Sequence, residues 1–183
     1  MALLLIDVIN PMTFPGSEGL VRNAKGAAPR IALLKQRARK ARVPAIYVND
    51  NFGRWRSDFE ATLENALDER SPGSAIARVL APDPHDYFVL KPKRSAFYGT
   101  SLDLLLSYLG AEVLVLAGFT TDMCVQSTAH DAFMRDLRVL VASDCVAAAT
   151  AKASRDALAA MKKLRAQCSM GARVDFAMLR QSA

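Results

Sequence analysis

Short apolar runs alternate along the chain with longer segments in which apolar residues recur every three or four positions. Short runs rich in β-branched residues are typical of buried strands, and the longer period is typical of amphipathic helices. The predicted strands are Ala2–Val8, Ala45–Asn49, Tyr87–Leu90, Val113–Ala117, Val139–Ala142 and, from a weaker pattern, Ala172–Val174. The predicted helices are Asn23–Arg42, Ser74–Leu80, Ser101–Leu109, Asp122–Asp136 and Thr150–Gln167.

This alternation of strand and helix predicts the fold class. Strands that are buried on both faces and joined by crossover helices form parallel sheets. We therefore predict an α/β fold, a three-layer, doubly wound (Rossmann-like) and mostly parallel six-stranded sheet with helices on both faces. The chain has 183 residues, 51% of them hydrophobic and 23% charged, so residues 1–183 are expected to form a single domain.

One segment, from Asn51 to Pro72, follows neither period and is predicted to be a long loop after the second strand. Aromatic and basic side chains, among them Trp55, crowd its first residues. Ligands of open α/β sheets bind beyond the carboxyl ends of the strands, so this loop is a candidate pocket wall. A surface loop with one buried tryptophan is the alternative.

The net charge is +6, and most of the excess lies in two segments with helical spacing, residues 30–42 and 152–165. Proteins that bind single-stranded nucleic acids interleave aromatic residues with basic ones. Neither of these two segments has that arrangement. We interpret both segments as solvated helix faces. A small-molecule substrate and no nucleic-acid partner are therefore expected.

The cysteine content indicates a reducing compartment. Cys124, Cys145 and Cys168 are an odd number without a CxxC pair, which fits neither a disulfide framework nor a zinc knuckle. The first apolar run, Ala2–Ile6, is too short for a signal sequence or a membrane span. We expect a cytoplasmic protein with no membrane partner.

Three reactive side chains lie at or just after the carboxyl ends of three predicted strands. Asp7 closes the first strand, Lys91 follows the third, and Cys124 follows the fourth after a short turn. A doubly wound fold brings such strand ends to one edge of the sheet, so we expect the three to converge. A carboxylate beside an apolar run is costly to bury unless it is paired or reacting. A purely structural ion pair between Asp7 and Lys91 is the alternative that the pattern leaves open.

The position of Cys124 differs from that of the other two cysteines. It falls in the first turn of a predicted helix, where the helix dipole favours negative charge, as a nearby ammonium also would. We expect these effects to lower the pKa of its thiol and to make it a nucleophile. Cys145 and Cys168 lack such surroundings and are expected to be quiet core residues.

Three sequence blocks carry a family resemblance: LLIDVIN at residues 4–10, KPKRSAF at residues 91–97 and LAGFTTDMCV at residues 116–125. They resemble the isochorismatase-like cysteine hydrolases, a family that includes nicotinamidases and N-carbamoylsarcosine amidohydrolases. The resemblance implies that Asp7, Lys91 and Cys124 form a catalytic triad. It also implies a homo-oligomer, either a dimer or a tetramer.

The same resemblance implies features of the surroundings of the triad. It implies a cis peptide bond between Phe119 and Thr120, and an oxyanion hole made by the backbone N–H groups of Thr120 and Cys124. The substrate pocket that it implies is lined by Asn10, Phe14, Trp55 and Phe97.

Departures from the family pattern bear on metal binding. Nicotinamidases typically hold a metal through an Asp-x-His pair after the second strand and a further histidine. Here the corresponding residues are Asp50, Asn51 and Phe52, and the two histidines, His85 and His130, lie elsewhere. We therefore predict no metal and no cofactor.

The retained cysteine bears on the reaction. Family members that split a vinyl ether generally lack this cysteine, so Cys124 favours an amide, carbamoyl or ureido substrate. The predicted function is a cysteine-dependent hydrolase that acts through a thioester acyl-enzyme. Arg54, Arg56 and Arg94 could bind a substrate carboxylate or could be solvated surface charges, and the sequence leaves both open.

Two other functions remain as alternatives. Cys124 could be a redox-sensing thiol with Cys145 as its resolving cysteine. The chain could also be a non-catalytic module that binds a small molecule. Nucleotide binding is not expected, because the sequence contains neither GxGxxG after the first strand nor GxxxxGK[ST].

Overall fold

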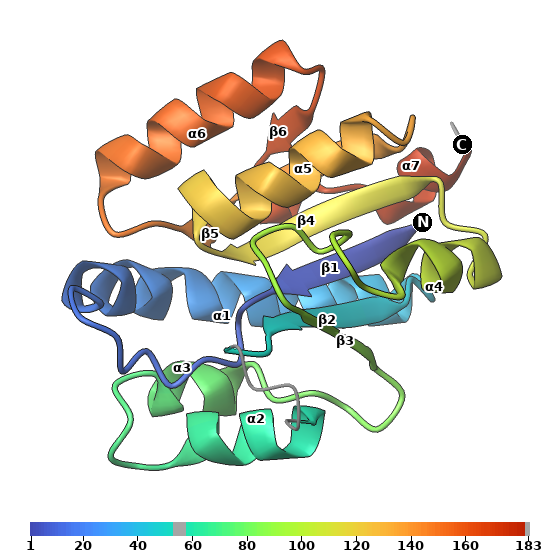
Figure 1. Ribbon diagram of the computed structural model, residues 1–183. Coiled ribbons are helices and arrows are strands. Elements are labelled where there is room, and N and C mark those ends of the chain that lie inside the picture. Colours follow the sequence, from blue (N-terminus) through green and yellow to red (C-terminus); the bar gives the residue numbers. More distant parts are fainter. Residues whose placement is uncertain (53–57, 182–183) are drawn as a thin grey trace.

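In the computed structural model, which describes residues 1–52 and 58–181, six strands form one sheet (Figure 1). The strands are β1 (Ala2–Ile6), β2 (Ala45–Asp50), β3 (Tyr87–Lys91), β4 (Val113–Phe119), β5 (Arg138–Ala147) and β6 (Gln167–Ser169). Their order is β3-β2-β1-β4-β5-β6, and every pairing between them is parallel. The predicted doubly wound α/β fold is therefore confirmed, and the order of the strands reverses between β1 and β4.

Helices cover both faces of the sheet (Figure 1). One face packs against α1 (Glu18–Lys40), α2 (Phe59–Leu67), α3 (Ser74–Val79) and α7 (Phe176–Gln181), and the other against α4 (Leu102–Tyr108), α5 (Gln126–Phe133) and α6 (Ala151–Lys163). Successive residues of β1 alternate between the two cores, with Leu3 and Leu5 on the α1 face and Leu4 and Ile6 on the α5 face. Burial on both faces explains why β1 has no polar position.

Helix α2 lies in the segment that the sequence analysis predicted to be a loop. Asp58 caps its start, because the Asp58 carboxylate accepts a hydrogen bond from the Ala61 N–H group at 2.8 Å. Phe59 then stacks on Phe88 of β3, with ring centroids 4.9 Å apart. The prediction was wrong here although Phe59, Thr62 and Ala66 are buried at helical spacing, because a run of nine residues gives only two turns of the pattern.

The prediction of a last strand at Ala172–Val174 was also wrong. Residues Gly171–Arg173 form a 3-10 turn, and β6 instead comes earlier and pairs with residues 140–142 of β5. Gly171 donates a backbone hydrogen bond to the Asp144 carboxylate, and a Cβ atom on it would lie 2.7 Å from the Cys145 sulfur. This close packing fixes the turn through side chains, which a strand pattern does not reveal.

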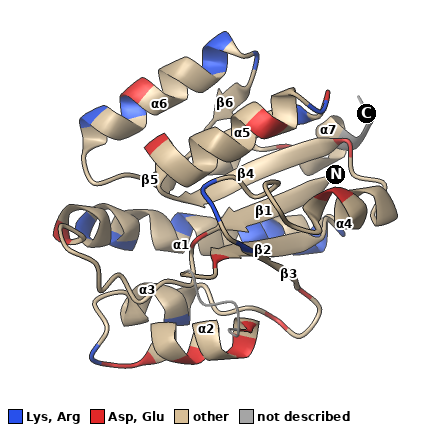
Figure 2. Ribbon diagram, viewed as in Figure 1, with Lys and Arg blue, Asp and Glu red and all other residues tan. Residues whose placement is uncertain are grey.

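The basic residues of the two helical segments lie on α1 and α6 or directly after them, and Asp156 is the one acidic residue within residues 30–42 and 152–165 (Figure 2). Not all of them are simply solvated. Lys35 forms ion pairs with Asp83 and Asp86, and Arg37 donates hydrogen bonds to the carbonyls of Gly171 and Val174. These contacts tie α1 to loops at the edge of the sheet. Among the described residues no helix is long and apolar enough to cross a membrane.

Candidate active site

The carboxyl ends of the strands bring the three predicted catalytic side chains together. Asp7 directly follows β1 in a left-handed conformation (φ 52°), Lys91 is the last residue of β3, and Cys124 lies in a π-helical turn, Thr121–Val125, after β4. The Lys91 Nζ atom lies 2.9 Å from Asp7 Oδ2 and 3.6 Å from the Cys124 Sγ atom. Lys91 is fully buried and Asp7 is 6% exposed. One ammonium thus contacts both a carboxylate and a thiol.

Asp50, at the end of β2, is a fourth polar residue of this group. Its backbone N–H donates to Asp7 Oδ1 at 2.8 Å, and its Oδ2 atom lies 3.5 Å from Lys91 Nζ. Its Oδ1 atom accepts a hydrogen bond from the Phe52 N–H group. In the sequence, Asp50 stands out only as part of a metal motif that is absent here. Its position at the end of a strand next to β3 was the signal that could have identified it.

The charges within the group set the protonation of the thiol. Burial, followed by the Asp7 carboxylate, raises the pKa of the Cys124 thiol to about 12, and the Lys91 ammonium offsets only part of this. Burial also raises the pKa of Asp7, against the opposing effect of Lys91. Burial disfavours the charged form of Lys91, but Asp7, Cys124 and Asp50 together raise its pKa.

The predicted lowering of the Cys124 pKa is therefore wrong. The helix dipole and the ammonium were expected to dominate, yet the thiol is buried beside a carboxylate, and both effects favour the protonated form. The surroundings of Cys124 therefore favour the protonated thiol in the free protein.

The chain reaches Cys124 through a tight turn. Gly118 has a φ of 117°, and a Cβ atom there would lie 2.1 Å from the Ile6 carbonyl oxygen, so only glycine allows β4 this close to β1. The peptide bond between Phe119 and Thr120 is cis. The Thr120 carbonyl accepts hydrogen bonds from the N–H groups of Met123 and Val125, which closes the turn that carries Cys124.

A cavity of about 470 Å³ lies between the loop after β1, Phe52 after β2, and helix α2 with the residues that follow it, and two predicted pocket residues, Asn10 and Phe14, line it. Phe52 lines it as well, two residues after Asp50, and its ring and that of Phe14 are partly exposed. Phe97 lies elsewhere, buried in the core of the α5 face with the Arg135 guanidinium over its ring. The place of Phe97 in the pocket stays a prediction.

Three residues named by the sequence analysis, Arg54, Trp55 and Arg56, lie outside the described residues. Arg94 lies within them, in the segment after β3, and is exposed. Its contact with a substrate also stays a prediction.

The residues near Asp50 do not fit the metal site of nicotinamidases. The Asp50 carboxylate is engaged by Lys91 and by the Phe52 N–H group, and Phe52 stands where such a site has its histidine. In the described part of the chain, no three His, Cys, Asp or Glu residues are grouped so that they could hold a metal ion. His85 lies beside a separate cavity with Lys35, and His130 lies on α5.

The other two cysteines lie apart from the triad. Cys145 is buried in the core of the α1 face, whereas Cys124 packs against the core of the opposite face. Cys168 lies on the edge strand β6, with its sulfur 3.9 Å from the Leu158 carbonyl oxygen of α6. All three thiols are free. The sheet between Cys124 and Cys145 disfavours the redox alternative, because a resolving cysteine has to reach the sulfur that it attacks.

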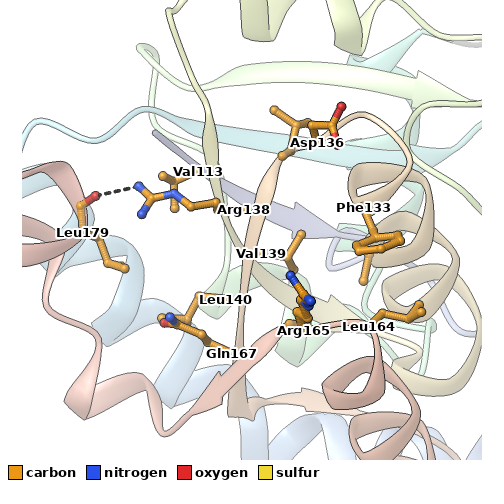
Figure 3. Close-up of a pocket in the computed structure, with 13 residues that line it drawn as sticks. Val113, Phe133, Asp136, Arg138, Val139, Leu140, Leu164, Arg165, Gln167 and Leu179 are labelled. Carbon is orange, nitrogen blue, oxygen red and sulfur yellow. Dashed lines mark hydrogen bonds between the residues drawn. The ribbon is translucent and has the colours of Figure 1, made fainter. Parts of the chain in front are cut away.

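A second cavity, of about 310 Å³, lies at the opposite end of the sheet, where β4, β5 and β6 begin (Figure 3). Arg138 and Arg165 lie at its rim with Phe133, and the Arg138 guanidinium donates to the Leu179 carbonyl (Figure 3). No cysteine or lysine lines it. The combination of thiol, carboxylate and ammonium at the carboxyl edge makes that edge the candidate active site.

Comparison with known proteins agrees with this geometry. The family model for the isochorismatase domain matches residues 1–173. The uncharacterized isochorismatase family protein YaaI of Bacillus subtilis is 36% identical over 163 residues, which cover 89% of each chain. Maleamate amidohydrolase of Pseudomonas putida is 29% identical over 153 residues, 79% of this chain and 71% of that one.

A solved structure agrees with the sequence comparisons. N-carbamoylsarcosine amidase from Thermoplasma acidophilum superposes with a TM-score of 0.72 at 27% identity, over 95% of this chain and 98% of that chain. The family match spans all of the triad and the whole sheet. The protein therefore belongs to the isochorismatase family.

Proposed function

We propose that the protein is a cysteine-dependent hydrolase that cleaves the C–N bond of a small amide, carbamoyl or ureido substrate through a thioester acyl-enzyme. One observation carries the proposal. The Lys91 ammonium lies within 2.9 Å of the Asp7 carboxylate and 3.6 Å of the Cys124 sulfur, so a base, a nucleophile and a fixed positive charge share one site. The names of two relatives, a maleamate amidohydrolase and an N-carbamoylsarcosine amidase, support this substrate class.

In the first half of the reaction, Asp7 takes the proton of the Cys124 thiol as the sulfur attacks the substrate carbonyl. Because the pKa of the thiol is raised to about 12, this proton transfer accompanies the attack instead of preceding it. The higher pKa of Asp7 makes it a stronger base than an exposed carboxylate. Lys91 keeps its charge and stabilises the thiolate that develops 3.6 Å away.

The oxyanion of the tetrahedral intermediate is held by the backbone N–H groups of Thr120 and Cys124 in this proposal. Such preorganised donors contribute about 3–4 kcal/mol each to the stabilisation of the transition state. Asp7 then gives its proton to the leaving nitrogen, the C–N bond breaks, and the acyl group remains on Cys124 as a thioester.

Water completes the cycle in the second half. Asp7 accepts a proton from the water as the oxygen attacks the thioester carbonyl, and the bond between the carbonyl carbon and Cys124 breaks. The products are an acid and ammonia or an amine, and the thiol regains its proton from Asp7. The residues of the chain supply every group in this scheme.

The test is ammonia release from maleamate, N-carbamoylsarcosine and simple primary amides by the wild-type protein and by Cys124→Ala. We expect turnover of at least one of these compounds by the wild type and none by Cys124→Ala. Cys168→Ala is the matched control and should keep its activity, because its sulfur lies beside α6 and away from the triad. Equal rates for wild type and Cys124→Ala would overturn the mechanism, and binding without turnover would favour the non-catalytic module.

We also propose a cytoplasmic homo-oligomer, a dimer or a tetramer, as the family resemblance implies. Light scattering after size-exclusion chromatography measures the mass directly. A single species with the mass of one 19.9 kDa chain at micromolar concentration would contradict the oligomer.

A further inference from the structure

Lys91 and Cys124 are carried by segments that do not adjoin in the sheet. Lys91 ends β3 and Cys124 follows β4, and the strands β2 and β1 lie between them. No ladder of strand hydrogen bonds therefore joins the two segments. Another contact has to hold the turn that carries the nucleophile against the segment that carries the ammonium.

Thr128 on α5 supplies such a contact. It is fully buried, and its Oγ1 atom accepts a hydrogen bond from the Ala96 N–H group at 3.0 Å. The same hydroxyl donates its hydrogen to the Cys124 carbonyl oxygen at 2.7 Å. One side chain thus bridges the segment that begins at Lys91 and the backbone of Cys124 itself.

The Ala96 end of this bridge is itself held in place. The Thr100 hydroxyl donates to the Ala96 carbonyl at 2.6 Å, and the Ser95 hydroxyl accepts from the Phe97 N–H group at 3.2 Å. Both peptide groups beside Ala96 are therefore fixed. A shift of the Cys124 backbone would have to break the bond to Thr128 or move this whole segment.

A threonine hydroxyl that bonds the carbonyl four residues earlier is common in helices and by itself indicates no function. Thr128 differs because its other bond reaches a residue 32 positions away in the chain. The bonded carbonyl also belongs to a π-helical turn, a rare element that is frequent at functional sites.

We propose that Thr128 is a positioning residue whose hydroxyl holds Cys124 at reacting distance from Lys91 and Asp7. The inference rests on the proposed function in taking Cys124 as the nucleophile. Thr128 does not touch the reacting atoms and acts only through the Cys124 backbone. Loss of the Thr128 hydroxyl should therefore alter the surroundings of the Cys124 thiol more than it alters the stability of the fold.

The test compares Thr128→Val, which keeps the shape and loses the hydroxyl, with Thr128→Ser, which keeps the hydroxyl. The readout is the rate of iodoacetamide alkylation at Cys124 as a function of pH, measured by peptide mass spectrometry, with Cys145 and Cys168 as internal references. The charged groups that act on the thiol are Asp7 and Lys91, with Asp50 beside Lys91. Thr150→Ala is the stability control, because it removes only the N-terminal cap of α6.

We expect the alkylation midpoint of Cys124 in Thr128→Val to move from its raised value toward that of an ordinary thiol, about 8.5, as the sulfur leaves Asp7. Thr128→Ser and Thr150→Ala should keep the profile of the wild type. On a substrate identified by the ammonia assay, Thr128→Val should lower kcat by about tenfold to a hundredfold, with a smaller change in KM. If Thr128→Val does not fold, Thr128→Ala removes the hydroxyl without adding a methyl group against the two polar partners.

A Thr128→Val protein that melts earlier, as Thr150→Ala does, but alkylates with the wild-type pH profile would overturn the inference. The alkylation needs no substrate, so its result stands even if no amide is hydrolysed. A shifted profile without any amide turnover would support the role of Thr128 and contradict the proposed hydrolase. If Thr128→Val hydrolyses an amide with an unchanged kcat and alkylates with the wild-type pH profile, the result would support the proposed hydrolase and contradict the role of Thr128.

Discussion

Two lysines of this protein each sit between two aspartates, at opposite ends of the sheet, and only one of them adjoins a nucleophile. Lys91 contacts Asp7 and Asp50 at 2.9 and 3.5 Å, and Lys35 contacts Asp86 and Asp83 at 2.6 and 3.1 Å. The pKa of both lysines is raised, because Asp7, Cys124 and Asp50 around Lys91, and Asp86 and Tyr47 around Lys35, more than compensate for burial. Ion pairing and a raised lysine pKa therefore do not distinguish the two clusters.

The clusters differ in what lies beside the carboxylates, since each has one mostly buried carboxylate, Asp7 at 8% and Asp86 at 11% side-chain exposure, and one more exposed carboxylate, Asp50 at 34% and Asp83 at 42%. The Asp7 side chain is 8% exposed, and burial raises its pKa, whereas the Asp83 side chain is 42% exposed and the hydrogen bond from Lys35 lowers its pKa. Beside Lys35 lies Tyr47, whose ring centroid is 5.1 Å from Lys35 Nζ, whose hydroxyl donates to the Leu80 carbonyl and whose pKa burial raises to about 12. A buried base beside a thiol is suited to proton transfer, while the carboxylates around Lys35 adjoin a phenol and anchor α1 to the loop before β3.

The largest expected effect separates the two lysines directly. Lys91→Met removes the ammonium that contacts the buried Asp7, so it should reduce turnover at least a thousandfold and destabilise the fold by about 3–5 kcal/mol. Lys35→Met, the matched change, should cost about 1.5–3 kcal/mol and leave kcat unchanged. Urea unfolding and steady-state kinetics measure both. Equal losses of activity in Lys91→Met and Lys35→Met would contradict a catalytic role that is specific to the Lys91 cluster.

A smaller effect is expected from Asp7→Asn, which keeps the shape of the side chain and removes the base. General acid–base groups contribute about a hundredfold to ten-thousandfold, so kcat should fall by that range on any substrate of the wild type. Thiol titration should also show a lower pKa for Cys124, because the Asp7 carboxylate raises it. A thiol whose pKa does not respond to this change would show that Asp7 is only structural.

Asp50→Asn should change the pH dependence more than the maximal rate. The Asp50 carboxylate raises the pKa of Lys91, and it contacts the same ammonium as the Asp7 carboxylate does. Without it, the ammonium acts more fully on Asp7 and lowers the pKa of that base, so the acid limb of the activity profile should move to lower pH by up to about one unit. Identical activity–pH profiles for the wild type and Asp50→Asn would show that Asp50 does not influence the pKa of Asp7.

The smallest effect is expected at the structural cluster. The pKa of Asp83 is lowered in the folded state, so its ionised form stabilises the fold above the ordinary value of 3.8, and this contribution is lost as the pH falls through the lowered pKa. Asp83→Asn should therefore cost less than about 1 kcal/mol at neutral pH, because the pair is partly exposed, and less than that at pH 3, below the ordinary value of 3.8. A cost that is equal at both pH values would indicate packing instead of charge.

Most of the fold could be predicted from the apolar pattern, and the exceptions have physical causes. Strands β1 to β4 begin and end within two residues of the predicted positions, since β1, β2 and β4 are almost entirely buried apolar runs and β3, although partly exposed at the edge of the sheet, is still a short apolar run. Strand β5 continues to Ala147 past an irregularity in its pairing with β4, which the pattern of residues 139–142 does not show. The start of α1 at Glu18 was missed by five residues.

The site was only partly predictable, because a sequence gives the positions of strand ends and not the distances between side chains. The convergence of Asp7, Lys91 and Cys124 followed from topology. The roles of Asp50 and Thr128 depend on the register of β2 with β3 and on a contact between α5 and the segment after β3. The pKa of Cys124 could not be predicted, because burial and the distance to a carboxylate decide its direction.

The most direct test of the central claim is mass spectrometry of the Cys124 peptide from a reaction quenched in acid during turnover of an amide substrate. We predict that this peptide gains the mass of the acyl group, that the peptides carrying Cys145 and Cys168 do not, and that the added mass disappears once the substrate is consumed. Steady turnover with an unmodified Cys124 peptide, together with full activity of Cys124→Ala, would contradict the account.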